Sequence, residues 1–271
     1  MMTPNDQYFL GYSPAEQQRL ERQARSLAPD SHLLFDRIGI RPDSRAVEVG
    51  CGPLGCLEIL SRRVGPTGSV VGVEINADLV RLAREYLADN KIGNVEVHQG
   101  DAKTTGLPRE SFDLATARLV LVNVPEPERI VDEMVALVKP GGMVALHEAD
   151  FGYNQCDPPL PAWDHLLGVL VDYSKLNGID LFIARRVPRM LRAAGLLEVQ
   201  VNPIVHAYPV DDPRRTLLLH FAENLRDRIL TQGLISEAEF KETLAAVKVR
   251  LDDPATLVLG FLFIQAWGRK P

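Results

Sequence analysis

The segment Val47-Glu48-Val49-Gly50-Cys51-Gly52-Pro53-Leu54-Gly55 decides the fold of this chain. A short β-branched run ends in a glycine-rich turn, and residues 54–63 continue as a helix-like segment. Glycine turns the backbone at positive φ with no Cβ in the way, so Gly50 and Gly52 let the backbone approach a ligand closely. A doubly wound α/β domain presents its backbone to a nucleotide-like cofactor in this way.

The next two apolar runs each end in an acid. The run from Ser69 to Glu74 places a carboxylate about 20 residues after the turn, where it can accept both hydroxyl hydrogens of a ribose. The third run ends in Gly100-Asp101-Ala102, where Asp101 can accept from an adenine amino group and the Ala102 N–H can face a ring nitrogen. We therefore expect an adenosine-containing cofactor along these strand ends.

The acid inside the turn indicates which cofactor this is. S-adenosylmethionine (SAM) carries an ammonium group and a cationic sulfur but no phosphate, so Glu48 suits it directly or through water. A nicotinamide dinucleotide would also use the glycines and Glu74, but it gives no reason for Glu48 and Asp101. A lone glycine motif is weak evidence, whereas the ordered set of turn, Glu74 and Asp101 is much stronger.

These residues resemble the class I SAM-dependent methyltransferases, in particular the broad group with small-molecule acceptors. Residues 111–118 resemble the family's fourth strand, Lys139-Pro140-Gly141-Gly142 the turn before its fifth, and Arg192-Ala193-Ala194-Gly195-Leu196 the helix end before its sixth. The strong motifs cover roughly residues 45–150. Pro53-Leu54 after the glycines and Glu58 in the following helix depart from the family pattern.

The resemblance implies SAM as the methyl donor and S-adenosylhomocysteine as the product. It also assigns Ile75, beside Glu74, and Arg118, at the end of the fourth strand, to the cofactor site. Tyr8 and Tyr12 belong to a leading segment that resembles a subgroup with helices over the cofactor. An aromatic face suits a cation, so both could close over the sulfonium, with Tyr8 counted in the cofactor site and Tyr12 in the substrate site; ordinary packing of the two rings stays the alternative. Known members of that subgroup methylate natural products, quinones and similar metabolites, and a few related SAM-binding proteins catalyse cyclisations.

The order of the apolar segments predicts an α/β fold. We expect a Rossmann-like, seven-stranded, mostly parallel sheet with an antiparallel last strand and a helical cap. Strands are expected at residues 45–49, 69–74, 95–99, 112–117, 143–148, 197–205 and 256–267, and helices at residues 31–38, 54–63, 77–89 and 126–138.

The cap is predicted from the remaining helical segments. Residues 1–40 read as a helical lid, and residues 41–271 as the methyltransferase core, with cap insertions at about 151–180 and 208–254. Ser236, followed by Glu239 three residues later, marks a helix start within the second insertion. We expect these helices to lie at the carboxyl ends of the strands, where ligands bind in open α/β sheets.

Composition limits the classes of partner. The chain has 271 residues, 46% of them hydrophobic, and a formal net charge of −6. A nucleic-acid site needs a basic surface, so we expect no nucleic-acid partner. No apolar run is long enough for a bilayer and the N-terminus lacks a signal pattern, so we expect no membrane insertion and a cytoplasmic location. A homo-oligomer remains open, and the three cysteines have no zinc spacing, so no metal is expected.

Methyl transfer from a sulfonium needs alignment more than acid–base chemistry, so a catalytic base is optional. The fifth strand ends in Leu146-His147-Glu148-Ala149-Asp150, and His147 and Glu148 are the catalytic candidates. Alternation places them on opposite faces, so only one is expected to face the pocket. Asp150 and Asn123 are the substrate-contact candidates.

The leading hypothesis is therefore a SAM-dependent methyltransferase that methylates oxygen or carbon of a small, largely apolar metabolite of specialised metabolism. The segment Leu121-Val122-Asn123-Val124-Pro125 stands where methylases of base or amide nitrogens have an Asn-Pro-Pro-Tyr-type motif, which disfavours those acceptors. Two alternatives stay open: a cyclase or pericyclase that keeps SAM bound without consuming it, and a non-enzymatic SAM-binding protein. The sequence does not identify the acceptor.

Overall fold

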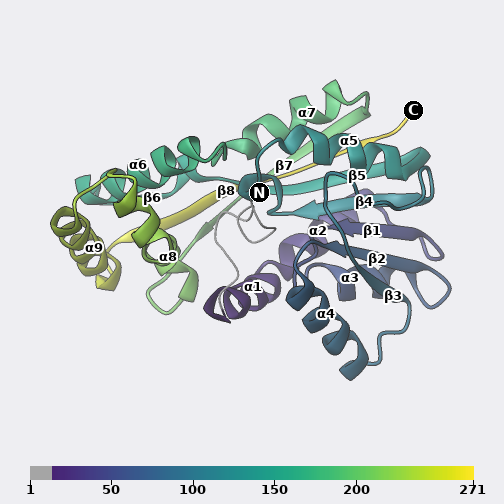
Figure 1. The fold of residues 1–271 in the computed structure, drawn as a ribbon, viewed down its shortest axis with the longest axis horizontal. Helices are drawn as coiled ribbons and strands as arrows, with labels where there is room; N and C mark the ends of the chain where they lie inside the picture. The colour runs from purple at the N-terminus through teal and green to yellow at the C-terminus, as the bar shows by residue number, and fades with distance from the viewer. Residues whose placement is uncertain (1–13) are drawn as a thin grey trace.

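The computed structural model describes residues 14–271, and one mixed β-sheet runs through it (Figure 1). Its strands lie in the order β3-β2-β1-β4-β5-β8-β6, and β7 also pairs with β8. The strands are β1 Arg45–Val49, β2 Ser69–Glu74, β3 Val95–Gln99, β4 Phe112–Arg118, β5 Val138–Asp150, β6 Gln155–Asp157, β7 Leu197–Ala207 and β8 Leu257–Arg269. The predicted bounds of β1, β2 and β3 match those observed.

The sheet is parallel from β3 to β5, and β8 runs antiparallel to both β5 and β7. The predicted Rossmann-like sheet with an antiparallel last strand is therefore confirmed. The additional strand, β6, has three residues and pairs with residues 257–259 of β8, beyond the end of β5. This strand was not predicted, because Pro158 and Pro159 follow it directly and are typical of a loop, and three residues are too few to show the alternation of a strand.

Helices cover both faces of the sheet: α5 and α7 lie on one face, and α2, α3 and α4 on the other (Figure 1). The helices are α1 Pro14–Ser26, α2 Ala28–Ile38, α3 Leu57–Val64, α4 Ala77–Asp89, α5 Pro127–Leu137, α6 Pro161–Leu176, α7 Val187–Ala193, α8 Leu217–Thr231 and α9 Glu237–Asp252. The bounds of α4 match the prediction. Helix α3 begins three residues later than predicted because Gly52 and Gly55 both hold positive φ, which no helix residue adopts.

Each face of the sheet has its own apolar core. Val47 and Val49 of β1 pack toward α5, whereas Ala46 of the same strand packs toward α2 and α3. This is the alternation expected of a strand covered on both sides. Packing on both faces therefore holds the strands in place, and with them the residues at the carboxyl edge of the sheet.

Helices α6, α8 and α9 pack on one another to form a lobe beside the sheet, and α1 lies opposite them across the carboxyl edge (Figure 1). Helix α9 starts as predicted, because the Ser236 side chain accepts a hydrogen bond from the Glu239 N–H at 3.2 Å. The division into a lid of residues 1–40 and a core remains a prediction, because residues 1–13 lie outside the described part.

A buried arginine ties this lobe to the sheet. Arg215 lies in the short 3-10 turn η5 (Pro213–Thr216), is 3% exposed, and donates to four backbone carbonyls. The acceptors are the carbonyls of Tyr208, Leu251, Asp253 and Thr256, at 2.6–2.9 Å. Two of these carbonyls lie at the C-terminal end of α9, where a cation is favoured by the helix dipole.

Candidate functional site

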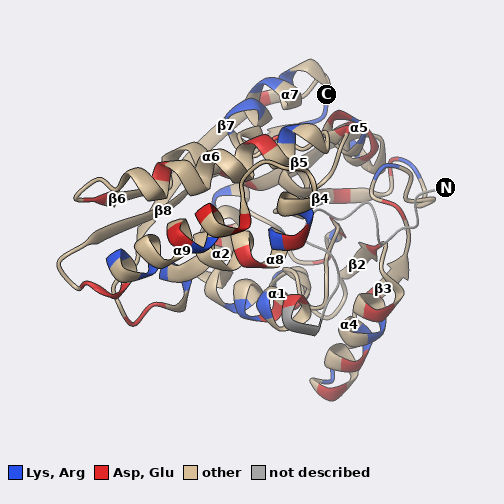
Figure 2. Cartoon of the chain, turned by 60° about the vertical axis from the view of Figure 1, so that its left-hand side comes forward, with Lys and Arg blue, Asp and Glu red and all other residues tan. Residues whose placement is uncertain are grey.

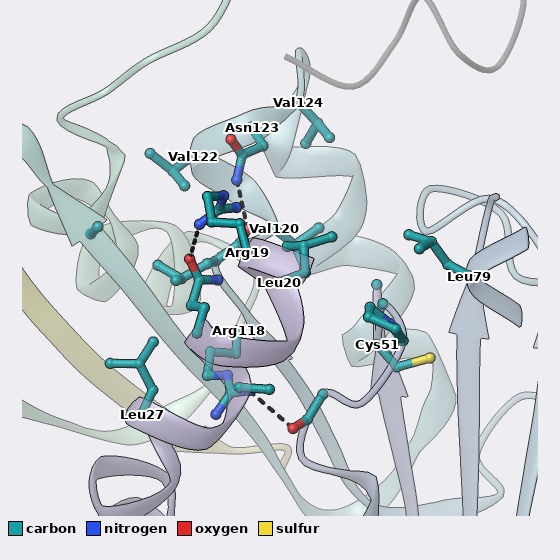
Figure 3. Close-up of a pocket in the computed structure, with 18 of the residues that line it drawn as sticks. Arg19, Leu20, Leu27, Cys51, Leu79, Arg118, Val120, Val122, Asn123 and Val124 are labelled. Carbon is teal, nitrogen blue, oxygen red and sulfur yellow. Dashed lines mark hydrogen bonds between the residues drawn. The ribbon is translucent and has the colours of Figure 1, made fainter. Parts of the chain in front are cut away.

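A cavity lies at the carboxyl ends of the strands, between the glycine turn and the cap (Figure 3). One end is lined by the turn and by the residues that follow β2 and β3. The other end is lined by the end of β5, by β8 and by cap helices α6 and α8. Helix α1 covers both ends; its Arg19 and Leu20 face the cavity, as does Leu27 between α1 and α2.

The glycine turn leaves no room for side chains at two positions. Gly50 has φ +69°, and a Cβ there would lie 2.6 Å from Cγ2 of Val120. Gly55 has φ +50°, and a Cβ there would lie 2.5 Å from both the Glu48 carboxylate and the Cys51 carbonyl oxygen. Glycine is therefore required by space as well as by φ. The turn closes tightly around the Glu48 carboxylate.

Glu48 is buried at the base of the turn. Both of its carboxylate oxygens accept the Cys56 backbone N–H, at 2.9 and 2.7 Å. Burial raises the pKa of Glu48 to about 7, although the nearby charge of Arg118 opposes that rise. Arg118 donates to the Ser31 hydroxyl at 2.8 Å and to the Gly55 carbonyl at 3.0 Å (Figure 3). An incoming cation would favour the ionised form of this carboxyl.

Glu74 and its neighbours line the same end. The Glu74 carboxylate accepts the N–H groups of Gly52, at 3.0 Å, and Asn76, at 2.9 Å, and burial raises its pKa. Ile75, Asp101 and Ala102 also line the cavity. Glu74 is thus fixed with lone pairs still available to a diol.

These groups fit SAM. The turn offers close backbone approach, Glu74 offers acceptors for ribose hydroxyls, and Asp101 offers a carboxylate whose Oδ1 is already oriented by the Lys103 N–H at 2.8 Å. The structure brings together all the described residues predicted for the cofactor: Glu48, Gly50, Gly52, Glu74, Ile75, Asp101, Ala102 and Arg118. Their binding of SAM remains a prediction, and Tyr8 and Tyr12 lie outside the described residues.

The far end of the cavity is aromatic. Phe151 stacks on Phe261 with ring centroids 4.0 Å apart, and Phe221 lies 5.8 Å from Phe151. Four aliphatic side chains complete the wall: Ala149 of β5, Leu170 of α6, Leu181 of the loop that follows α6, and Leu217 of α8. Such a chamber favours a flat or extended apolar ligand.

The two arginines beside this chamber are neutralised by carboxylates. Arg19 pairs with Glu16 at 2.7 Å, and Arg214 pairs with Asp212 at 2.7 Å. Their guanidinium groups also lie over aromatic rings, Arg19 over Phe221 and Arg214 over Tyr208. The positive charge of each arginine is therefore balanced by a neighbouring carboxylate.

His147 and Glu148 lie on opposite faces of the sheet, as alternation predicts, but neither belongs to the described lining of the cavity. Both ring nitrogens of His147 are buried without a hydrogen-bond partner, and burial lowers its pKa to about 3. Its ring meets Phe263 edge-on at 5.4 Å. A neutral, enclosed imidazole suits packing more than proton transfer, and a catalytic role for it stays untested.

Glu148 shapes the loop after β4. Its carboxylate accepts the N–H groups of Val120 and Leu121 at 3.0 and 2.9 Å, and of Val122 at 3.2 Å. Burial raises the pKa of Glu148 to about 7. Because Val120 and Val122 line the cavity, Glu148 positions part of the wall from behind.

The two described substrate candidates differ in position. Asn123 lines the cavity, and its amide donates to the Leu119 carbonyl at 2.8 Å (Figure 3). Asp150 is fully buried behind the wall, where it accepts from Arg185 at 2.7 Å and from the Gly152 N–H at 2.9 Å. The structure thus places Asn123 in the cavity wall and leaves Asp150 occupied by protein donors, and contact of Asn123 with a substrate stays a prediction.

Sequence reasoning missed the aromatic residues of the cap, Phe221 and Tyr208. Their segments are far apart in the chain, and nothing local marks either one as cavity lining. One signal was present: Gly260 interrupts an otherwise apolar strand, which often means that another group approaches the backbone closely. That group is the ring of Tyr208.

The surface charges are interspersed. Lys and Arg alternate with Asp and Glu along α4, α8 and α9 in the view of Figure 2. Ion pairs one helical turn apart account for part of this pattern, such as Arg81 with Glu85 and Lys248 with Asp252. Within residues 14–271, no helix has the length and apolarity needed to cross a membrane, and no cluster of three His, Cys, Asp or Glu side chains could hold a metal ion.

Comparison with known proteins yields a family profile described as a methyltransferase domain, which matches residues 47–146. A demethylmenaquinone methyltransferase from Geobacillus kaustophilus is 30% identical over 183 residues, which cover 62% of this chain and 76% of that protein. An uncharacterised 37.1 kDa protein in transposon TN4556 of Streptomyces fradiae is 29% identical over 198 residues, or 72% of this chain and 56% of that protein.

A solved structure supports the fold. A putative methyltransferase from Bacillus halodurans superposes with a TM-score of 0.60 at 18% identity, covering 90% of this chain and 99% of that one.

Proposed function

Because this chain belongs to the class I SAM-dependent methyltransferases, we propose that it methylates an oxygen or carbon atom of a small, largely apolar metabolite. One observation carries the proposal. A single cavity joins the carboxylate-lined glycine turn to an aromatic chamber beneath the cap. A donor held at the first end can therefore face an acceptor held at the second.

The residues of the chain would align the two reactants. SAM supplies the methyl group on a sulfonium that is already activated for displacement. The glycine turn, Glu74 and Asp101 would hold the cofactor, while Phe151, Phe221 and Phe261 would hold the acceptor and exclude water. Alignment and dehydration account for much of the rate enhancement in such transfers.

The lid prediction fits this arrangement. Leu20 of α1 and Leu27, between α1 and α2, belong to the cavity wall, so residues 1–40 would close the site over bound SAM. The Geobacillus relative is, by its name, an enzyme that acts on demethylmenaquinone. A ring of comparable apolarity would suit the aromatic chamber, and we propose that the acceptor belongs to specialised metabolism.

Mass spectrometry tests the proposal. Purified protein is incubated with SAM and a panel of prenylated, polyketide and phenolic compounds. We expect a product that is heavier by one methyl group, together with S-adenosylhomocysteine. Tight SAM binding with an isomerised product and no S-adenosylhomocysteine would instead indicate a cyclase. Absence of SAM binding in a calorimetric titration would contradict the cofactor assignment itself.

A further inference from the structure

Arg118 is held at the cofactor end of the cavity by two distant parts of the chain. It is the last residue of β4 and lines the cavity. Its guanidinium donates to the Gly55 carbonyl of the glycine turn at 3.0 Å and to the Ser31 hydroxyl of α2 at 2.8 Å (Figure 3). A guanidinium has five N–H donors, so these two bonds leave donors for a ligand.

The Ser31 hydroxyl is itself fixed in direction. It is buried, its O–H donates to the Leu27 carbonyl at 3.1 Å, and its oxygen accepts the Cys56 thiol at 3.5 Å as well as Arg118. A hydroxyl offers one donor and two acceptor lone pairs, so all three are used here. Ser31 does not belong to the described lining of the cavity, so it acts on the site through Arg118.

The residue before Ser31 anchors α2 on the sheet. The Asp30 carboxylate lies 2.8 Å from Nε2 of His206 in β7, and the Asp30 carbonyl accepts the Gln265 side chain of β8 at 2.6 Å. Gln265 is fully buried, and its side-chain oxygen accepts the Asn202 amide at 3.0 Å. The first turn of α2 is therefore tied to β7 and β8 through Asp30 and to β4 through Ser31.

The charges at this end of the cavity match the amino-acid portion of SAM, which carries an ammonium group and a carboxylate. Glu48 and Arg118 both line the cavity, and the charge of Arg118 is near enough to oppose the rise in the pKa of Glu48. One acid and one cation therefore lie where a ligand with one charge of each sign would bind. A guanidinium binds a carboxylate through two parallel N–H bonds, which requires that its plane be held in one orientation.

We propose that α2 is part of the cofactor site and that Ser31 is a positioning residue, which holds the Arg118 guanidinium for the carboxylate of the cofactor's amino-acid portion. The inference rests on the proposed function and deepens it, because the leading helices would then set the affinity for SAM through this bond as well as by covering the cavity. Without the Ser31 hydroxyl, the guanidinium keeps its bond to Gly55 but is free to rotate about it. Ordering the guanidinium would then cost part of the binding free energy.

A pair of ligands isolates the amino-acid portion of the cofactor. S-adenosylhomocysteine carries it, whereas methylthioadenosine keeps the adenosine and the sulfur and lacks it. Both are titrated into the full chain, the first by calorimetry and the second by NMR. In Ser31→Ala, the affinity for S-adenosylhomocysteine should fall about fivefold and that for methylthioadenosine should stay unchanged. Arg118→Met removes the guanidinium itself and should lower the affinity for S-adenosylhomocysteine at least about tenfold.

Ser174→Ala is the matched control. Ser174 is as buried as Ser31, and its O–H also donates to a carbonyl one turn earlier, that of Val171 at 2.7 Å, but it belongs to α6 in the lobe. Both alanine variants lose a similar bond, so we expect similar falls in melting temperature but a loss of S-adenosylhomocysteine affinity only in Ser31→Ala. Combining Ser31→Ala with Arg118→Met should give the affinity of Arg118→Met alone, because Ser31 acts through Arg118.

Equal weakening of both ligands in Ser31→Ala, no weakening of S-adenosylhomocysteine, or a further fall in the double variant would overturn the inference. Equal affinities of the wild type for the two ligands would overturn it too, because the amino-acid portion would then contribute nothing. In each of these cases, a wild type that binds S-adenosylhomocysteine keeps the proposed function and loses only the role of Ser31. Failure of the wild type to bind S-adenosylhomocysteine removes the methyltransferase site itself.

Discussion

The cofactor end and the acceptor end of the cavity are built by different means. At the cofactor end, backbone turns and buried carboxylates define the surface, and three short motifs supply them. At the acceptor end, aromatic side chains define the surface, and they come from the 3-10 turn that follows β5 (Phe151–Tyr153), from α8 and from β8. The first end depends on backbone conformation and the second on side-chain shape, so substitutions should affect the two ends separately.

The largest effect is expected at the turn. Gly55→Ala would place a Cβ 2.5 Å from the Glu48 carboxylate at a φ of +50°. The turn would have to open, so we expect SAM affinity to fall at least about 100-fold and stability to fall by about 2 kcal/mol. Isothermal calorimetry and urea unfolding measure the two effects.

Gly106→Ala is the matched control for that variant. Gly106 has a φ of +71° but open space around its Cβ position, so only the backbone strain is shared. SAM binding should be unchanged in this control. Equal losses in both variants would mean that strain, and not the clash with Glu48, governs the turn.

The next effect concerns the chamber. Phe221→Ala removes a ring from the aromatic cluster, so the acceptor KM should rise about tenfold or more while the SAM dissociation constant stays the same. Stability should fall by about 3 kcal/mol. Steady-state kinetics with a product-forming acceptor and calorimetry with SAM separate the two.

Phe240→Ala provides the comparison. Phe240 is fully buried in α9 and lies outside the described cavity lining, so the same truncation costs similar stability without touching the acceptor. If both variants raised the acceptor KM equally, the rise would reflect the general loss of stability and not the loss of a chamber side chain. The idea that the two ends respond separately to substitution would then be wrong.

The third prediction concerns pH. The folded-state pKa of Glu148 is about 7 and its ordinary value is 4.5, so the folded protein binds more protons between these values. Its contribution to stability is therefore greatest below pH 4.5 and is lost as the pH rises through 7. Relative to Glu148→Gln, the wild type should lose about 3 kcal/mol of unfolding free energy between pH 4.5 and pH 8.

Urea unfolding of both proteins at several pH values in that interval measures this difference. Glu48, whose pKa is also about 7, is present in both proteins, so its contribution cancels. A difference that is independent of pH would show that Glu148 is not buried as a carboxylate above pH 7.

The smallest effect on activity is expected at His147. His147→Leu removes two buried nitrogens that lack partners, and the side chain does not line the cavity, so kcat should change less than about threefold. Because the folded-state pKa of about 3 lies below the ordinary 6.5, the wild type should lose stability relative to the variant as the pH falls below 6.5. A loss in kcat of about 100-fold or more would contradict this expectation and would support His147 as a catalytic base.

The cofactor end was predictable because its signals are local. Gly50 follows β1, Glu74 is the last residue of β2, and Asp101 lies two residues after β3. Parallel strands bring their carboxyl ends to one edge of the sheet. The start of α3 was predicted too early, because nothing in the sequence shows that Gly55 as well as Gly52 would take positive φ.

The acceptor end depends on contacts between distant segments. Tyr208 and Gly260 are separated by 52 positions in the numbering, and only the pairing of β7 with β8 brings them together. Asp150 lies at the end of β5, close to where it was expected, yet its carboxylate is bonded by Arg185 from a later segment. Strand ends can be located from sequence, but the partners of side chains that cross between segments cannot.

The four bonds of Arg215 have a consequence for how this protein can diversify. All four acceptors are main-chain carbonyls, at Tyr208, Leu251, Asp253 and Thr256, and every amino acid at those positions supplies the same oxygen. Mutations in the lobe can therefore exchange the side chains that face the chamber while this clasp keeps the backbone in register. The shape of the chamber, and with it the set of compounds that fit, can therefore change by substitution as long as Arg215 is retained.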